Sequence, residues 1–353
     1  MSTPPKLPKR RFLAAAAALA TAAATALPAL PAAAQTTKIR FQLDWRFEGP
    51  AALFLAAQAK GYFKEEKLDV TIDAGNGSAN AVNRVATATY DMGFADIAAL
   101  MEFWGNNPGA PGKPVAVMMV YNNTPATVFA LKKSGIRAPA DLAGKKLGAP
   151  VFDAGRKAFP IFAKVNNLDP AKVSWTSMDP PLRETMLARG DVDAITGFYF
   201  TSLLNLNARG VADDDIVMLP YPQYGVKLYG NAIIAAEDFL RKNPDAVRGF
   251  LRAFTRATRD VLADPEGHVK YVKQRDPIID EALELRRLKL AIQSTIATPD
   301  AKADGFGDIN PERLALMASQ VSETFALKER VDGSRIFDRS FLPPKEQRDI
   351  LSK

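Results

Sequence analysis

The stretch KIRFQL at residues 38–43 opens an alternation of strand and helix patterns that decides the fold. A helical pattern over 50–60 follows, and LDVTI at 68–72 then returns to the two-residue period of a strand. The same order continues through a helix at 79–88, an apolar strand at 92–95, a helix at 97–104 and the strongly apolar strand PVAVMMV at 114–120. This β-α-β-α-β order predicts a largely parallel sheet with helices on both faces.

A second unit of the same kind follows the first. Its predicted strands lie at 127–131, 145–149, 173–177, 194–196 and 216–219, with helices at 154–165, 182–189 and 201–208 between them. After one more strand at 228–236 the chain is almost entirely helical, with long amphipathic helices predicted at 244–262, 279–296 and 311–325. The pattern therefore predicts an α/β protein whose core is divided between two lobes.

The first residues have the three parts of a secretory signal peptide. Four lysines and arginines lie within 6–11, an alanine-rich apolar stretch covers 12–30, and three alanines at 32–34 precede Gln35. We therefore expect residues 1–34 to be removed and the mature protein to lie in the periplasm. The expected export route is Sec, and the arginine pair also suggests the Tat route, although it stands one place off the usual spacing. A retained membrane anchor is the alternative, which the prolines in the apolar stretch disfavour.

The charge and the cysteine content exclude several classes of function. The chain carries a formal net charge of +7, but four of its lysines and arginines and no acid lie in residues 1–34, which leaves the mature protein near +3. A nearly balanced protein has no electrostatic reason to bind nucleic acid. The absence of cysteine excludes disulfides, thiolate nucleophiles and cysteine-bound metals. With 47% hydrophobic residues the mature chain can build its own core, and we expect a soluble monomer.

Recognisable catalytic motifs are missing from the sequence. The single histidine, His268, follows Asp264-Pro265 in a polar stretch that predicts a solvated helix. Neither a Ser-His-Asp set nor the usual histidine- or cysteine-based metal site is available. The segment GNGS at 75–78 has the wrong length and spacing for a phosphate-binding loop. The residues therefore predict a protein that is not an enzyme and that holds no cofactor and no metal.

Polar and aromatic residues follow the carboxyl ends of the predicted strands in both units. Open α/β proteins bind ligands at these ends, where helix N-termini also present unpaired N–H groups. We therefore expect these segments to form a ligand-binding cleft. The candidate ligand-binding residues are Asp44, Trp45, Glu48, Ser78, Asn80, Asp96, Asn122, Asn123, Asp153, Gly155, Arg156, Phe198 and Tyr199.

Several of these candidates have a purely structural alternative. Ser78, Asp96 and Asp153 stand where a helix N-cap is expected. The two asparagines at 122–123 are also common turn residues. The aromatic candidates can equally belong to the core, although the position of Trp45 at a strand exit favours the cleft.

The order of short motifs along the chain resembles a known family. FQLDW at 41–45, AKGYF at 59–63, GNGS at 75–78 and DMGFAD at 91–96 are followed by DLAGKKLG at 141–148 and GDVDA at 190–194. This series is similar to periplasmic substrate-binding proteins of ABC importers in the NMT1/THI5-like group, which includes nitrate, sulfonate, taurine and thiamine-pyrimidine binders. The resemblance covers most of the mature chain.

The resemblance implies a type II periplasmic-binding-protein fold, in which two lobes with mixed, mostly parallel sheets are joined by two hinge crossings. The crossings are expected near 123–128 and near 225–231, so that lobe 1 comprises 36–125 and 228–353 and lobe 2 comprises 126–227. The implied partners are a small-molecule ligand and an ABC permease in the inner membrane. Closure of the lobes would bury the ligand and create the surface that the importer recognises.

The resemblance also bears on the ligand. In pyrimidine-binding members the residue that matches Trp45 can stack on a flat ring, and Phe198 and Tyr199 would add aromatic faces. This chain departs from those members at 46–50, where RFEGP replaces a stretch with Asn and His, and at Ser202, which stands where they carry a glutamate. These two departures argue against an aminopyrimidine itself, whereas the aromatic residues still favour a small aromatic or heterocyclic ligand that resembles a pyrimidine precursor. Its acidic group, where it has one, would pair with Arg156.

Three other functions stay open at this point. The chain can be a binding protein for small anions of the sulfonate or nitrate type, or a pyrimidine-synthase-like enzyme of the same fold. A third possibility is a sensor domain that presents its ligand to a membrane receptor.

Overall fold

The structure is a computed structural model that describes residues 1–3 and 36–351. The predicted signal peptide at 1–34 falls almost entirely outside these residues. The segment Thr37–Lys353 forms one compact unit, which carries all the elements discussed below. None of the helices in the described residues has the length and apolar character needed to span a bilayer.

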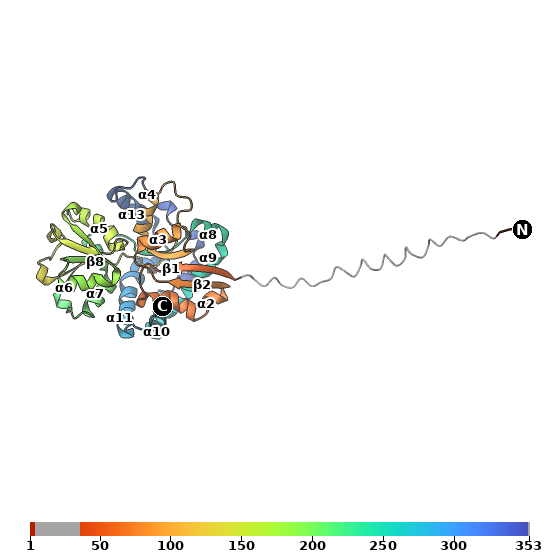
Figure 1. Cartoon of the computed structure of the whole chain (residues 1–353), viewed down its shortest axis with the longest axis horizontal. Helices are drawn as coiled ribbons and strands as arrows, with labels where there is room; N and C mark the ends of the chain where they lie inside the picture. The colour runs from red at the N-terminus through yellow and green to blue at the C-terminus, as the bar shows by residue number, and fades with distance from the viewer. Residues whose placement is uncertain (4–35, 352–353) are drawn as a thin grey trace. The chain divides into compact units, whose positions relative to one another are not determined.

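Within residues 36–351 the strands form two five-stranded sheets, one in each lobe (Figure 1). The sheet of lobe 1 has the order β2-β1-β3-β10-β4. Its strands are β1 (Thr37–Gln42), β2 (Leu68–Asp73), β3 (Met92–Asp96), β4 (Val115–Met119) and β10 (Asn231–Ala235). The strands β2, β1 and β3 are parallel, as the alternating pattern predicts, whereas β10 runs antiparallel to both of its neighbours.

The sheet of lobe 2 repeats this topology with the order β7-β6-β8-β5-β9. Its strands are β5 (Ala126–Leu131), β6 (Lys146–Ala149), β7 (Ser174–Ser177), β8 (Ala194–Phe198) and β9 (Ile216–Pro220). Here β5 is antiparallel to β8 and β9. In each sheet the reversed strand is the first one after the chain crosses from the other lobe. These mixed sheets flanked by helices confirm the predicted fold class.

Helices cover both sheets, and those that the periodicity predicts lie within a few residues of the predicted positions. In lobe 2 they are α5 (Ala154–Val165), α6 (Arg183–Arg189) and α7 (Tyr199–Asn207). Lobe 1 has α1 (Ala52–Ala59), α2 (Tyr62–Glu65), α3 (Ser78–Ala86) and α4 (Ile97–Asn106) from the first half of the chain. Its C-terminal helices are α8 (Glu237–Lys242), α9 (Pro244–Ala263), α10 (Pro265–Arg275), α11 (Glu281–Ala291), α12 (Pro299–Asp304), α13 (Pro311–Thr324) and α14 (Lys345–Arg348).

The helix predicted at 279–296 differs from the structure at both ends. It begins at Glu281, because the Asp280 carboxylate accepts hydrogen bonds from the backbone N–H groups of Ala282 (2.9 Å) and Leu283 (3.1 Å). Its last turn, Ile292–Ile296, widens into a π-helix. The backbone N–H of Asn122 donates to the Thr295 carbonyl (2.7 Å), so this turn contacts the first crossing between the lobes.

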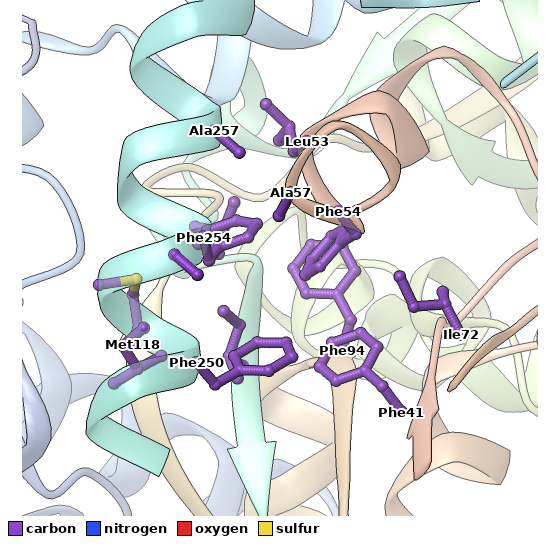
Figure 2. Close-up of a cluster of buried hydrophobic side chains, with 14 of the residues drawn as sticks. Phe41, Leu53, Phe54, Ala57, Ile72, Phe94, Met118, Phe250, Phe254 and Ala257 are labelled. Carbon is purple, nitrogen blue, oxygen red and sulfur yellow. The ribbon is translucent and has the colours of Figure 1, made fainter. Parts of the chain in front are cut away.

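The core of lobe 1 is a stack of phenylalanine rings between the sheet, α1 and α9 (Figure 2). Phe250 and Phe254 lie one turn apart on α9, and both side chains are fully buried. The Phe254 ring lies 4.6 Å from that of Phe54 on α1, and the Phe250 ring lies 5.0 Å from that of Phe41 on β1. This packing fixes α1, and with it the loop that follows β1.

Two crossing segments join the lobes and lie side by side. The chain passes from β4 to β5 and returns from β9 to β10. The N–H of Thr124 donates to the Leu228 carbonyl (3.0 Å), and the N–H of Gly230 donates to the Tyr121 carbonyl (2.9 Å). The lobe boundaries at 125/126 and 227/228 fall inside these segments and stay a prediction.

Candidate ligand-binding site

A pocket lies between the lobes, where loops beyond the carboxyl ends of strands from both sheets meet. It encloses about 580 Å³ of space between atoms, part of which is open to solvent. Its aromatic lining consists of Trp45, Phe54, Phe94, Tyr121, Phe198 and Phe200. Its polar and charged lining comes from Asp44, Arg46, Glu48 and Ser78 of lobe 1 and from Asp153, Arg183 and Thr201 of lobe 2.

The loop after β1 is held by the glycine-rich loop after β2. The N–H of Gly75 donates to the Trp45 carbonyl (2.9 Å), and the N–H of Gly77 donates to the Asp44 carbonyl (2.6 Å). A Cβ at position 75 would lie 2.1 Å from the Leu43 carbonyl oxygen, so only glycine fits there. The segment at 75–78 therefore allows close approach of two backbones and positions Asp44 and Trp45.

The Asp44 carboxyl group is buried at the base of the pocket without a cationic partner among the described residues. Its Oδ2 accepts hydrogen bonds from Asn231 Nδ2 (2.7 Å) and from Ser78 Oγ (3.3 Å). Burial raises the pKa of Asp44 to about 7, and the two hydrogen bonds only partly oppose this effect. Ser78 thus binds Asp44 and makes no side-chain capping bond to α3.

Arg183 crosses the pocket from lobe 2 and covers Trp45. Its guanidinium carbon lies 4.8 Å from the centroid of the indole ring, within cation–π range. Two carboxylates hold it, since Nη1 donates to Asp153 Oδ2 (3.1 Å) and Nε to Glu184 Oε1 (2.8 Å). Sequence reasoning missed Arg183 and Glu184, because charged residues at the start of a helix ordinarily indicate a solvated face.

Glu48 connects the pocket to both lobes. Its Oε2 accepts a hydrogen bond from Thr201 Oγ1 of lobe 2 (2.8 Å) and lies 3.5 Å from Arg287 Nη1 of α11. Its Oε1 lies 3.5 Å from Arg46 Nη2, and that arginine is half exposed. Glu48 itself is buried. Sequence reasoning also missed Arg287, which has no local signal for burial.

Two candidate aspartates cap helices, and of the two only Asp153 lines the pocket. Asp96 Oδ1 accepts from the Ala98 N–H (2.8 Å) at the start of α4, and Asp153 Oδ1 accepts from the Arg156 N–H (2.8 Å) at the start of α5. Burial raises the pKa of Asp96 to about 7, with a further increase from the nearby Asp44 and Asp153 carboxyls. Asp153 therefore both caps α5 and lines the pocket.

The remaining candidates lie outside the lining that the described residues form. Arg156 Nη1 donates to the Ala149 carbonyl and to Ser177 Oγ (both 3.0 Å), and its guanidinium lies over Trp175. Arg313 binds the side chains of both hinge asparagines, Asn122 (3.2 Å) and Asn123 (3.1 Å).

Three further candidates, Asn80, Gly155 and Tyr199, also lie outside the pocket lining. Asn80 lies on α3 beside a separate surface hollow. The carbonyl of Gly155 accepts from the Tyr221 hydroxyl (2.8 Å), and the Tyr199 N–H donates to the Pro125 carbonyl (2.8 Å). The structure thus brings together Asp44, Trp45, Glu48, Ser78, Asp153 and Phe198 in one pocket.

His268 differs from the sequence prediction of a solvated residue. It lies on α10, is buried, and its Nδ1 is 2.7 Å from the Asp264 carbonyl oxygen. The turn between α9 and α10 folds the polar stretch back against α1, which explains the burial. Among the described residues, no three His, Cys, Asp or Glu side chains are arranged to hold a metal ion.

The fold is that of the type II periplasmic binding proteins. One solved structure of this class, the alkanesulfonate-binding protein SsuA from Xanthomonas axonopodis pv. citri bound to MOPS, superimposes with a TM-score of 0.67. The match covers 86% of this chain and 98% of that one at 14% identity, and so it concerns the fold. The sequence profile of the NMT1/THI5-like family matches residues 50–268. The chain belongs to this family.

Of two curated relatives, one is named as an enzyme and the other as a binding protein. Over 256 residues the chain is 29% identical to 4-amino-5-hydroxymethyl-2-methylpyrimidine phosphate synthase from Aspergillus parasiticus, which covers 69% of this chain and 72% of the relative. Over 244 residues it is 26% identical to the riboflavin-binding protein RibY from Chloroflexus aurantiacus, which covers 69% of this chain and 67% of the relative.

The synthase similarity corrects one sequence prediction. The prediction that this protein is not an enzyme is wrong, because it is contradicted by a relative that matches over 69% of the chain and is named as a synthase. The missing motifs exclude only the mechanisms that those motifs encode. Buried carboxyl groups such as Asp44 and Asp96 carry no sequence signature of their perturbed pKa.

Proposed function

We propose that this protein captures a small planar heterocycle between its two lobes and delivers it, in the periplasm, to an ABC permease. The pocket carries the proposal, because aromatic rings from both lobes line it. Tyr121 makes edge-to-face contacts with Phe94 of lobe 1 at 5.2 Å and with Phe200 of lobe 2 at 5.9 Å. Such walls favour a flat ligand that gains contact area on closure.

The charges of the pocket favour a neutral or amino-bearing ligand over a sulfonate, a nitrate or a carboxylate. Asp44, Glu48 and Asp153 bring three carboxyl groups to the lining. The Arg183 guanidinium is already neutralised by Asp153 and Glu184. Arg46 is half exposed and faces Glu48. An anion would therefore compete with two carboxylates for the one buried guanidinium on the described lining, of which only Nη2 makes no hydrogen bond.

Three buried polar atoms of lining residues make no hydrogen bond to any described residue, namely Trp45 Nε1, Glu48 Oε1 and Arg183 Nη2. Arg183 Nη2 lies 2.8 Å from Glu184 Oε1 in an ion pair, which leaves Trp45 Nε1 and Glu48 Oε1 as the two atoms that can bind such a ligand. Leaving a buried polar atom without a partner costs about 1–3 kcal/mol. A ring that accepts from the indole N–H and donates to the carboxylate would remove both costs, and aminopyrimidines and flavins carry both kinds of group.

The relatives support the same ligand class. Riboflavin and the pyrimidine in the two relatives' names are planar heterocycles with ring nitrogens. The periplasmic location and the permease partner are proposed from the fold class and from the predicted signal peptide.

The experiment is a thermal-shift screen of aminopyrimidines, flavins, alkylsulfonates and nitrate against the mature protein. We expect heterocycles to raise the melting temperature, since a ligand at 100 times its Kd stabilises by about 2.7 kcal/mol. Trp45→Leu should lower the affinity about two- to ten-fold, the effect of losing one aromatic stacking contact. Trp175→Leu is the matched control, because Trp175 is also covered by an arginine but lies outside the pocket lining. Stabilisation by alkylsulfonates alone would reject the proposal.

A second candidate function is a chemical step on the bound heterocycle. The synthase similarity favours it, and Asp44 has a pKa of about 7 within the pocket, which suits a group that gives or takes a proton. Mass spectrometry of the bound compound after incubation tests this function. A new mass that disappears in Asp44→Asn would support it, and recovery of the unchanged compound would count against it.

A further inference from the structure

Helices α7 of lobe 2 and α11 of lobe 1 pack against each other beside the pocket (Figure 1). Arg287 of α11 reaches across this contact and is only 1% exposed. Its Nη1 donates to the backbone carbonyls of Phe200 (3.0 Å) and Thr201 (2.9 Å), and its Nη2 donates to Asn205 Oδ1 (2.9 Å). All three acceptors belong to the other lobe.

Lobe 1 holds the same guanidinium from its other side. Glu284 accepts from Arg287 Nε (2.8 Å) and Nη2 (3.1 Å), and Glu284 Oε2 also accepts from the Gly49 N–H (2.5 Å). Glu48, next to that glycine, binds the Thr201 hydroxyl. Arg287 is therefore the centre of a buried network that contains both lobes and the loop after β1.

We propose that Arg287 is a latch, a positioning residue that holds the two lobes closed over the pocket. Separation of the lobes would remove three of its acceptors at once, and it would also break the bond between Glu48 and Thr201. Hydrogen bonds that involve a charged group are stronger than neutral ones, so this cost is substantial. Arg287 is not part of the described pocket lining, so its effect on a ligand passes through closure.

The latch shares three residues with the pocket lining, Glu48, Phe200 and Thr201. Glu48 Oε1 has no hydrogen-bond partner among the described residues, and a donor on the ligand would fix the carboxylate whose other oxygen receives Thr201 Oγ1. Occupancy of the pocket would thereby strengthen the latch. This coupling rests on the proposed function, whereas the latch itself acts in the absence of a ligand.

The test measures lobe closure in the mature protein without a ligand. Because the chain has no cysteine, spin labels can be placed at Ile278→Cys in lobe 1 and Asp214→Cys in lobe 2, both exposed positions. Double electron–electron resonance then gives the ratio of closed to open molecules. We expect Arg287→Met to lower this ratio at least about ten-fold, the effect of losing one charged hydrogen bond or more. The matched control is Arg286→Met. Arg286 also lies near a carboxylate of lobe 2, 3.9 Å from Asp213, but both side chains are exposed, and exposed ion pairs contribute little.

Arg287→Met leaves two buried carboxylates without their partner, and misfolding is a risk. Asn205→Ala therefore serves as a second variant, because it removes one acceptor in lobe 2 and leaves the ion pairs intact. We expect a several-fold shift towards open molecules with unchanged circular dichroism. Closed-to-open ratios within two-fold of the parent in Asn205→Ala and in folded Arg287→Met would overturn the latch. A shift in these ratios together with a parent that binds no compound in the screen would support the latch and count against the proposed function.

Discussion

At the scale of single residues, the site is defined by charged groups that have been withdrawn from water. Arg183 and Arg287 are each 1% exposed, and each is paired with carboxylates. All three nitrogens of the Arg287 guanidinium donate hydrogen bonds, whereas Arg183 Nη2 makes none to a described residue. Asp44 is different, because only neutral groups donate to it. A buried carboxyl group without a cation favours its protonated form, which is why burial raises the pKa of Asp44 to about 7.

The raised pKa of Asp44 predicts a pH-dependent stability. The folded protein holds a proton on Asp44 up to about pH 7, whereas the unfolded chain loses it near the ordinary value of 3.8. The folded state thus binds more protons between about pH 4 and 7, and stability falls as the pH rises through this window. Asp44→Asn should flatten the fall in melting temperature, as calorimetry across that range can show.

Asp69→Asn provides the control for this experiment, since Asp69 is exposed on β2 of the same lobe. Part of the fall should persist in Asp44→Asn, because Asp96 has a similarly raised pKa. An identical pH profile in the parent, Asp44→Asn and Asp69→Asn would contradict the prediction.

At the scale of elements, the position of the loop after β1 depends on how α1 packs against α9. The rings of Phe54 and Phe254 face each other across this interface, with Ala57 and Ala257 beside them where the helices approach closely (Figure 2). Large and small side chains alternate along both helices, which allows close packing. The aromatic stack therefore stabilises lobe 1 and also positions Phe54, which lines the pocket.

Phe254→Ala should lower the free energy of unfolding by about 3–5 kcal/mol, the usual cost of removing a buried phenylalanine side chain. Urea denaturation followed by circular dichroism measures this loss. Leu316→Ala on α13 is the control, because Leu316 is 58% exposed. Equal losses in the two variants would show that the ring stack is not the structural core that we describe.

At the scale of the whole molecule, two lobes with the same strand topology face each other across one pocket. The crossings between them are bonded to each other, and Arg313 binds the Asn122 and Leu228 carbonyls (2.9 and 3.3 Å). The lobes are also joined between α7 and α11 by the Arg287 network. The molecule thus combines a bonded pair of crossings with a separate contact between lobes that can break, as hinge closure requires.

The predicted signal peptide leads to an expectation for the full chain. When it is expressed with a functional export pathway, the periplasmic fraction should contain a form that begins at Gln35, because Ala32 and Ala34 stand at the small-residue positions of a cleavage site. Intact-mass spectrometry measures the N-terminus. Ala34→Leu should block cleavage, and Ala34→Ser should leave it unchanged. Recovery of the uncleaved parent chain in the cytoplasm would contradict this expectation.

The sequence by itself determined the local structure and the family. Hydrophobic periodicity reports which face of each segment is buried, so strands and helices such as 68–72 and 154–165 were predicted within a residue or two. The residues at the carboxyl ends of the strands, Asp44 and Trp45 among them, follow from the same reasoning.

Only the tertiary structure decided the reversal of β5 and β10 and the burial of Arg183 and Arg287. Strand direction depends on where the chain crosses between lobes, which leaves no periodic trace. The burial of a guanidinium depends on acceptors far away in the chain, such as the Phe200 carbonyl for Arg287. The sequence does not show whether water or a distant carbonyl accepts the hydrogen bonds of an arginine. Only the folded structure therefore shows which arginines belong to the site.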